Sequence, residues 1–249
     1  MQQDYILNWK PSPTDVRDKL NAYSMLDNNN PSSAYLGLSM PIYDQGKLGS
    51  CTANAIGTAV MIALNAKQNA YFVPSRLFVY YNERAMEGTI NEDAGAFIRD
   101  GFKSINRDGV CDEKTWKYDE AKFAKKPTLK AYKEASLHKA LDYKSVSNTL
   151  SELKRCIINQ RAVVFGFNVY TSFLSKSVAL SGIMPLPKGN EACEGGHAVC
   201  VIGYDDVRQA FLVRNSWGKT WGINGSFWMP YSFITSYECD DFWNLNVIS

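Results

Sequence analysis

The spacing of apolar residues changes near the middle of the chain, and this change limits the folds that the sequence can adopt. The first half carries segments with helical spacing, bounded by residues that start and stop helices, at 52–66, 74–88 and 93–109. One more helix is predicted at 147–160, opened by a Ser or Asn cap. After it come short β-rich runs separated by turn signals, at 161–170, 197–206, 210–218 and 225–233. The sequence therefore predicts an α+β protein in which a helical part and an antiparallel sheet or barrel meet at a cleft.

This pattern divides the chain into three regions. Residues 1–40 are rich in Asn, Ser, Pro and Asp, so they predict an extended N-terminal arm and not a packed unit. Residues 41–135 are the expected helical subdomain, and residues 136–249 are the expected β-rich subdomain. A chain of 249 residues is long enough for two such subdomains around a shared cleft.

Composition excludes several classes of function. The formal net charge is +2, and the Lys and Arg residues are scattered, which argues against a nucleic-acid partner. The densest basic stretch, 122–133, is interleaved with apolar residues and indicates a solvated face. With two histidines and no C-x-x-C pair, we expect no metal site.

The termini and the apolar runs bear on where the protein acts. No apolar run approaches the roughly 20 residues of a membrane helix, and the N-terminus lacks the features of a secretory signal. An intracellular or virion-associated location follows, unless a leader is missing from this sequence. The six cysteines do not have the dense spacing of a small secreted disulfide domain.

The stretch "YDQGKLGSCTANA" (43–55) places Cys51 where a Gly-rich turn gives way to an Ala-rich helix. Amide groups at a helix N-terminus favour the thiolate form of a cysteine, which would make Cys51 a nucleophile. A buried and unreactive thiol is the ordinary alternative. Local sequence leaves both readings open.

A cysteine nucleophile needs a base, usually histidine, and the chain has two candidates. His138 lies in a polar stretch typical of a surface histidine, whereas His197 opens an apolar run after two glycines. Asn215 ends another apolar strand, and its amide oxygen could orient the imidazole ring. Trp217 could then cover that hydrogen bond. A structural histidine and a plain core tryptophan remain the alternatives for His197 and Trp217.

Three motifs, "QGKLGSC", "GGHAV" and "RNSWGKTWGINGSFW", together resemble the papain-like cysteine peptidase family, in the same chain order. The resemblance spans residues 41–235 and is closest to bacterial-type and viral-type members. The separation of Cys51 and His197 falls within the roughly 130–150 residues of the family pattern, and Asn215 lies somewhat beyond it. The resemblance implies a papain-like fold, with a helical left subdomain and an antiparallel, barrel-like right subdomain on either side of the active-site cleft.

The resemblance also implies roles for individual residues. It implies that Cys51 is the nucleophile and that His197 is the base, which also acts as an acid. Asn215 would orient the imidazole, and the side-chain amide of Gln45 would be part of the oxyanion hole. An oxyanion donor of this kind is typically worth about 3–4 kcal/mol. The substrate-binding positions are Ala94, Gly95, Gly196 and Trp217.

The chain departs from the family pattern at two positions. Leu48 stands where the family has a cysteine, which removes a familiar disulfide and fits a reducing compartment. Thr52 stands where the family has an aromatic residue, which alters a wall beside the nucleophile. Neither change removes a catalytic group.

The expected function is a cysteine peptidase that hydrolyses peptide bonds through a thioester acyl-enzyme, without a metal or organic cofactor. The implied partners are polypeptide substrates and protein inhibitors that bind the cleft, and not nucleic acid or membrane. The arm is short for a folded pro-segment, so we expect it either to strap over the cleft and limit access or to brace the surface. Two alternatives are acyl transfer to an amine by the same site, and a non-catalytic peptide-binding homologue.

Overall fold

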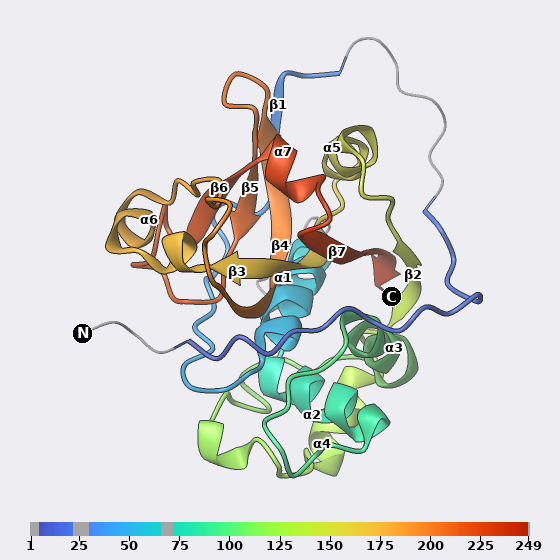
Figure 1. Ribbon diagram of the computed structural model, residues 1–249. Coiled ribbons are helices and arrows are strands. Elements are labelled where there is room, and N and C mark those ends of the chain that lie inside the picture. Colours follow the sequence, from blue (N-terminus) through green and yellow to red (C-terminus); the bar gives the residue numbers. More distant parts are fainter. Residues whose placement is uncertain (1–4, 22–29, 66–71, 249) are drawn as a thin grey trace.

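The computed structural model describes residues 5–21, 30–65 and 72–248. Residues 1–4 and 22–29 of the expected arm, and Ala66 at the end of the first expected helix, lie outside the described residues. Figure 1 shows a helical part below a sheet, with helix α1 running between them. The expected combination of helices with an antiparallel sheet is confirmed.

Helices are the main regular secondary structure in the first half of the chain. They are α1 (Cys51–Asn65), α2 (Arg76–Glu87), α3 (Ile98–Asp108), the short 3-10 helix η1 (Glu120–Lys122) and α4 (Leu129–Ala135). The side chain of Ser75 caps α2 by accepting from the Phe78 amide, and Gly88 ends this helix with a φ of 75°. Helices therefore form in the predicted segments of this half, and the ends of α2 are set by ordinary capping residues.

Two predicted helix starts are wrong. Helix α3 does not begin at residue 93, because Gly95 has a φ of +73° and the Asp93 carboxylate accepts hydrogen bonds from the Gly49 amide. These contacts hold 93–97 as a loop. Helix α5 (Leu150–Ile158) is capped by Thr149, whose side chain accepts from the Glu152 amide, and not by Ser or Asn.

The sheet has the strand order β2-β7-β3-β4-β5-β6, and β1 pairs with β4 beside this path. The strands are β1 (Ser33–Tyr35), β2 (Ala140–Ser145), β3 (Val163–Tyr170), β4 (Cys193–Asp205), β5 (Ala210–Arg214), β6 (Ser226–Pro230) and β7 (Cys239–Ile248). All named pairings are antiparallel, and the order of the described strands does not return to its start, so the sheet is open. The short helices η2 (Thr171–Leu174), α6 (Lys176–Ser181) and α7 (Tyr231–Ile234) lie between strands.

Helix α1 connects the two parts of the molecule. Its side chains are buried along nearly its whole length, and Ile56 and Val60 are fully buried. The helix packs against β4 and also against α2 and α3. Because α1 begins at Cys51 and β4 contains His197, this packing brings the two candidate catalytic elements together.

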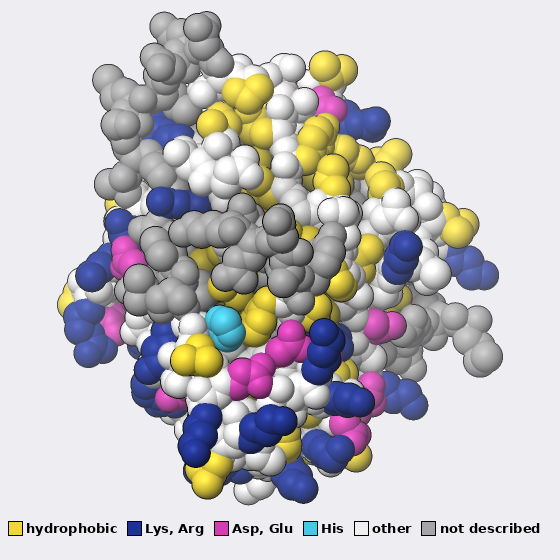
Figure 2. All heavy atoms as spheres, turned by 180° about the vertical axis from the view of Figure 1, so that it is seen from behind, with side chains coloured by type: hydrophobic (Ala, Val, Ile, Leu, Met, Phe, Trp, Pro, Cys, Tyr) yellow, Lys and Arg dark blue, Asp and Glu magenta, His cyan; other side chains and the backbone are white. Residues whose placement is uncertain are grey.

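The surface carries charges of both signs. Figure 2 shows Lys and Arg side chains interspersed with Asp and Glu side chains over the back of the molecule. Among the described residues, no helix combines the length and the apolar character needed to cross a membrane.

Candidate active site

Cys51 is the first residue of α1 and has no solvent-exposed surface. Burial raises the pKa of its thiol to about 12, and a hydrogen bond from the backbone amide of Ala198 acts in the opposite direction. Ala198 is the residue that follows His197 on β4. The sulfur therefore lies against the strand that carries the candidate base.

His197 forms a hydrogen bond with Asn215. Its Nε2 lies 2.8 Å from Asn215 Oδ1, and the same oxygen accepts from the Ser216 amide at 2.8 Å. Since Oδ1 is an acceptor, Nε2 carries the proton and Nδ1 is left with its lone pair. Burial lowers the pKa of His197 to about 4, and the bond to Asn215 opposes that shift.

Trp217 covers this pair. Its ring stacks on the imidazole of His197, with centroids 4.8 Å apart and an interplanar angle of 25°. Trp217 is 4% exposed and Asn215 is 2% exposed. Trp217 therefore covers one face of the imidazole ring that bonds to Asn215.

Gln45 is fixed from two sides in the loop before Cys51. Its Oε1 accepts from the Ser216 hydroxyl at 2.6 Å, and its Nε2 donates to the Leu48 carbonyl at 3.0 Å. One N–H of the Gln45 amide remains for a ligand. Ser216 was missed by the sequence reasoning, although its position between Asn215 and Trp217 is a signal that could have identified it.

The N-terminal arm lies across this site. Figure 1 shows residues 5–21 running between the helical part and the sheet. The ring of Tyr5 stacks on Trp217, with centroids 3.7 Å apart, and the Trp9 amide donates to the Gly196 carbonyl at 3.0 Å. The arm thus contacts two neighbours of His197: Gly196, which precedes it in the chain, and Trp217, which stacks on its ring.

Glycines shape the surface under the arm. A Cβ at Gly166 would lie 1.8 Å from the Trp9 indole, so only glycine lets this ring lie flat on β3. Added Cβ atoms at Gly49 and Gly95 would lie 2.3 Å and 2.8 Å from Asn8 side-chain atoms. Trp9 is 5% exposed in this position.

The predicted substrate-binding residues differ in their contacts. Gly95, Gly196 and Trp217 all contact the arm. Ala94 is exposed, and its neighbour Asp93 accepts from the Asn8 side chain at 3.1 Å through its carbonyl. The Asp93 carboxylate also accepts hydrogen bonds from the Gly49 amide and the Tyr80 hydroxyl. No motif in the sequence points to Asp93.

The two departures from the family pattern have structural counterparts. None of the cysteines in the described part of the chain forms a disulfide, and the Leu48 side chain is buried. The Thr52 hydroxyl donates to the buried carboxyl of Glu83 at 2.7 Å. Within the described ranges, no group of three or more His, Cys, Asp and Glu side chains could hold a metal ion.

A family model described as papain family cysteine protease matches residues 36–240. An uncharacterized peptidase C1-like protein of Acanthamoeba polyphaga mimivirus is 45% identical over 216 residues, covering 83% of this chain and 70% of the relative. The structure of xylellain, a cysteine protease from Xylella fastidiosa, superposes with a TM-score of 0.90 at 39% identity, covering 98% of this chain and 96% of that one. A Carica candamarcensis cysteine protease in complex with E-64 shares the fold, with a TM-score of 0.67 at 18% identity over 88% of this chain and 99% of that one. The chain therefore belongs to the papain family of cysteine proteases, and it is a cysteine peptidase that acts on polypeptides.

Proposed function

We propose that Cys51, His197 and Asn215 carry the peptidase reaction. The Cys51 sulfur attacks the carbonyl carbon of the scissile bond, and the thiol proton moves to Nδ1 of His197. His197 then gives this proton to the leaving amine, and a thioester remains on Cys51. A water molecule that loses its proton to His197 hydrolyses the thioester and frees the acid.

Gln45 and the Cys51 backbone amide are the proposed oxyanion donors. In the tetrahedral intermediate the former carbonyl oxygen carries a negative charge, which fixed donors stabilise without reorganising. The Ser216 hydroxyl supports this role, because its bond to Oε1 keeps the Gln45 nitrogen on the opposite side.

The observation that carries the assignment is the buried hydrogen bond of 2.8 Å between His197 and Asn215, which Trp217 covers. His197 lies on β4, the strand that contacts the Cys51 sulfur. A peptide-binding protein would need no such bond. The relative and the structural neighbours described above are peptidases and proteases, so neither acyl transfer nor pure binding is favoured.

Cys51→Ala tests this assignment against a matched buried cysteine. We expect Cys51→Ala to lower kcat/KM on a peptide substrate by at least about 10³-fold, because no other group can form the thioester. Cys200 is also fully buried but lies on β4, and Cys200→Ala should retain activity. Retained turnover in Cys51→Ala, with circular dichroism confirming the fold, would refute the assignment.

We also propose that the arm limits access to the cleft. The support lies in its contacts, since Tyr5 covers Trp217 and Trp9 bonds to Gly196 beside the base. A polypeptide substrate would need the same surface, so the arm must leave before the substrate binds. Protein inhibitors of the cleft would compete with the arm for the same reason.

A further inference from the structure

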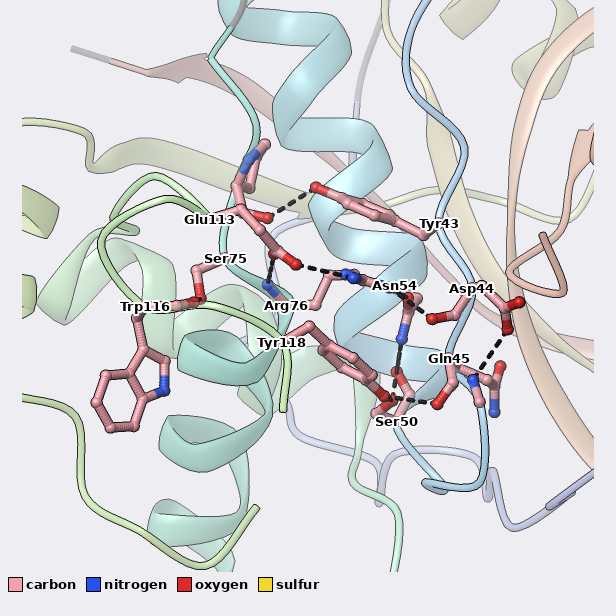
Figure 3. Close-up of polar contacts among 12 residues, drawn as sticks. Tyr43, Asp44, Gln45, Ser50, Asn54, Ser75, Arg76, Glu113, Trp116 and Tyr118 are labelled. Carbon is pink, nitrogen blue, oxygen red and sulfur yellow. Dashed lines mark hydrogen bonds and ion pairs between the residues drawn. The ribbon is translucent and has the colours of Figure 1, made fainter. Parts of the chain in front are cut away.

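A buried arginine lies behind the loop that carries Gln45. Arg76 begins helix α2, and its side chain is 10% exposed. Its Cζ lies 4.4 Å from the ring centroid of Tyr43 and 4.0 Å from that of Tyr118 (Figure 3). A guanidinium group stacks on aromatic faces while its N–H groups still donate in its own plane. The two rings therefore fix the plane in which Arg76 donates.

The guanidinium group joins three segments of the chain. Nη1 donates to the Asp44 carbonyl at 2.7 Å and to Asn54 Oδ1 at 3.2 Å, and Nη2 donates to Glu113 Oε1 at 2.8 Å. Asp44 lies in the loop before the nucleophile, Asn54 lies on α1, and Glu113 follows α3. The charge of Arg76 is paired with that of Glu113, so the burial of both groups is compensated.

Both peptide groups that flank the Cα atom of Gln45 are held. On one side, the Asp44 carbonyl accepts from Arg76, and the Gln45 amide donates to the Ser216 carbonyl at 2.8 Å. On the other side, the Gln45 carbonyl accepts from the Tyr118 hydroxyl at 2.7 Å. Because peptide groups are planar, fixing both of them fixes the direction of the Gln45 Cα–Cβ bond.

We propose that Arg76 is a positioning residue for peptide hydrolysis, acting through the oxyanion-binding amide of Gln45. The inference rests on the role proposed for Gln45. An oxyanion donor is effective only within about 2.7–3.1 Å of the developing charge, so a small shift of the loop weakens it. Arg76 touches no reacting atom, and its effect reaches the reaction through the backbone of residues 44 and 45.

Arg84 provides a matched control on the same helix. It is fully buried, and its Cζ lies 3.9 Å from the Tyr80 ring centroid. Its Nη1 donates to the carbonyls of Ile90 at 2.7 Å and Glu92 at 3.0 Å. Arg84 also donates to the carbonyls of Tyr80 and Phe123. It thus resembles Arg76 in burial and stacking, but none of these hydrogen bonds goes to the loop that carries Gln45.

A double-mutant cycle tests the coupling between Arg76 and Gln45. Every protein in the cycle is the full-length chain and also carries Tyr5→Ala and Trp9→Ala, which loosen the arm. We expect Arg76→Met to lower kcat/KM by about tenfold, less than the roughly 10²–10³-fold loss when an oxyanion donor is removed. In a Gln45→Ala background, the same substitution should change kcat/KM by less than about twofold, because its route to the reaction is gone. Equal losses in both backgrounds would overturn the inference.

The cycle also separates this inference from the proposed function. If Gln45→Ala lowers kcat/KM and Arg76→Met does not, the role of Gln45 stands and the role of Arg76 is refuted. If Gln45→Ala has no effect, the proposed oxyanion donor itself is wrong, and the inference falls with it.

A second readout distinguishes positioning from general loss of structure. A peptide aldehyde gains a bond from the Cys51 sulfur to its carbonyl carbon, the thiol proton ends on the former carbonyl oxygen, and that oxygen occupies the oxyanion site. Iodoacetamide alkylates the same sulfur with loss of iodide and places no oxyanion there. Arg76→Met should weaken aldehyde inhibition by about tenfold and leave the alkylation rate unchanged. A parallel fall in both quantities contradicts positioning.

Further variants keep the test decisive if Arg76→Met folds poorly. Arg76→Met with Glu113→Gln removes both charges of the pair, and Arg76→Lys keeps the charge but lacks the planar group. Both should lower aldehyde affinity relative to the alkylation rate, with a smaller effect for lysine. Arg84→Met should leave that ratio unchanged. A ratio that changes equally in the Arg84 and Arg76 variants refutes the inference.

Discussion

The proposed catalytic side chains of Cys51 and His197 are fully buried, and burial disfavours their charged forms. Burial raises the pKa of Cys51 to about 12 and lowers that of His197 to about 4. In this arrangement, burial therefore favours the neutral thiol and the neutral imidazole at pH 7. Since the thiolate is the nucleophile, the closed arrangement is also chemically less reactive.

Arm release should change the pH at which Cys51 reacts. In the full-length chain, we expect iodoacetamide labelling of Cys51 to be slow at pH 7 and to rise with pH through pH 9, because a raised pKa keeps the thiol protonated. In the Tyr5→Ala, Trp9→Ala variant, solvent reaches the sulfur and its pKa falls, so the plateau should move to lower pH.

Mass spectrometry of the labelled peptides measures this shift, with the exposed Cys193 as an internal reference. Easier access alone would multiply the rate by the same factor at every pH. An unchanged pH profile would therefore contradict the electrostatic explanation while leaving the steric one intact.

At the scale of elements, a buried carboxyl links helices α1 and α2. Glu83 has no exposed surface, its Oε1 accepts from the Thr52 hydroxyl, and its Oε2 has no hydrogen-bond partner among the described residues. Burial raises the pKa of this carboxyl well above its usual value. Thr52, which stands where the family pattern has an aromatic residue, thus contacts a carboxyl group whose neutral form is favoured.

Glu83→Gln should make the protein more stable at high pH. The folded state holds a proton that the unfolded state releases above pH 4.5, so the wild-type free energy of unfolding falls as pH rises, by up to about 1.4 kcal/mol per pH unit. Glutamine does not titrate, so the difference between variant and wild type should grow from pH 5 to pH 8 in urea unfolding.

Thr52→Val serves as the comparison for that experiment, because it removes the hydroxyl partner and keeps the carboxyl. It should show the same downward trend with pH as the wild type. A Glu83→Gln difference that is identical at pH 5 and pH 8 would mean that Glu83 is ionised in the folded protein.

Across the whole molecule, the arm ties the helical part to the sheet. Its Asp15 and Asp18 lie 3.4 Å and 3.5 Å from Arg99 on α3, and the Ser12 hydroxyl donates to Asp241 on β7 at 2.8 Å. Farther along the chain, β1 pairs with β4. Truncation at Ser39 would therefore remove a strand of the sheet along with the contacts over the cleft, and point substitutions give a cleaner test.

Tyr5→Ala combined with Trp9→Ala should activate the full-length peptidase. Loss of a buried tryptophan side chain costs about 3–5 kcal/mol, so the closed arm loses most of its advantage. We expect kcat/KM to rise by at least about tenfold, which corresponds to about 1.4 kcal/mol. Val16→Ala, at a fully exposed arm residue, is the control and should not change activity. Equal activity of all three proteins would show that the arm is only a brace.

The sequence by itself determined the chemistry and the order of the elements. The resemblance of three motifs to one family selected Cys51, His197 and Asn215, which were candidates first because each stands at a sharp local transition, from turn to helix or at the end of an apolar strand. The helical and β-rich halves were predictable for the same reason, since periodicity is a local property of the chain.

Only the tertiary structure decided which residues support the site. Arg76 donates to the Asp44 carbonyl, Asp93 accepts from the Gly49 amide and Ser216 donates to Gln45, and each of these bonds joins distant segments of the chain. Strands β2 and β7 likewise pair across most of the second half of the chain. The packing of the Trp9 ring against Gly166 depends on two positions that no local pattern connects. Such contacts are set by the packing of whole elements, and this packing has no signature within any single stretch of sequence.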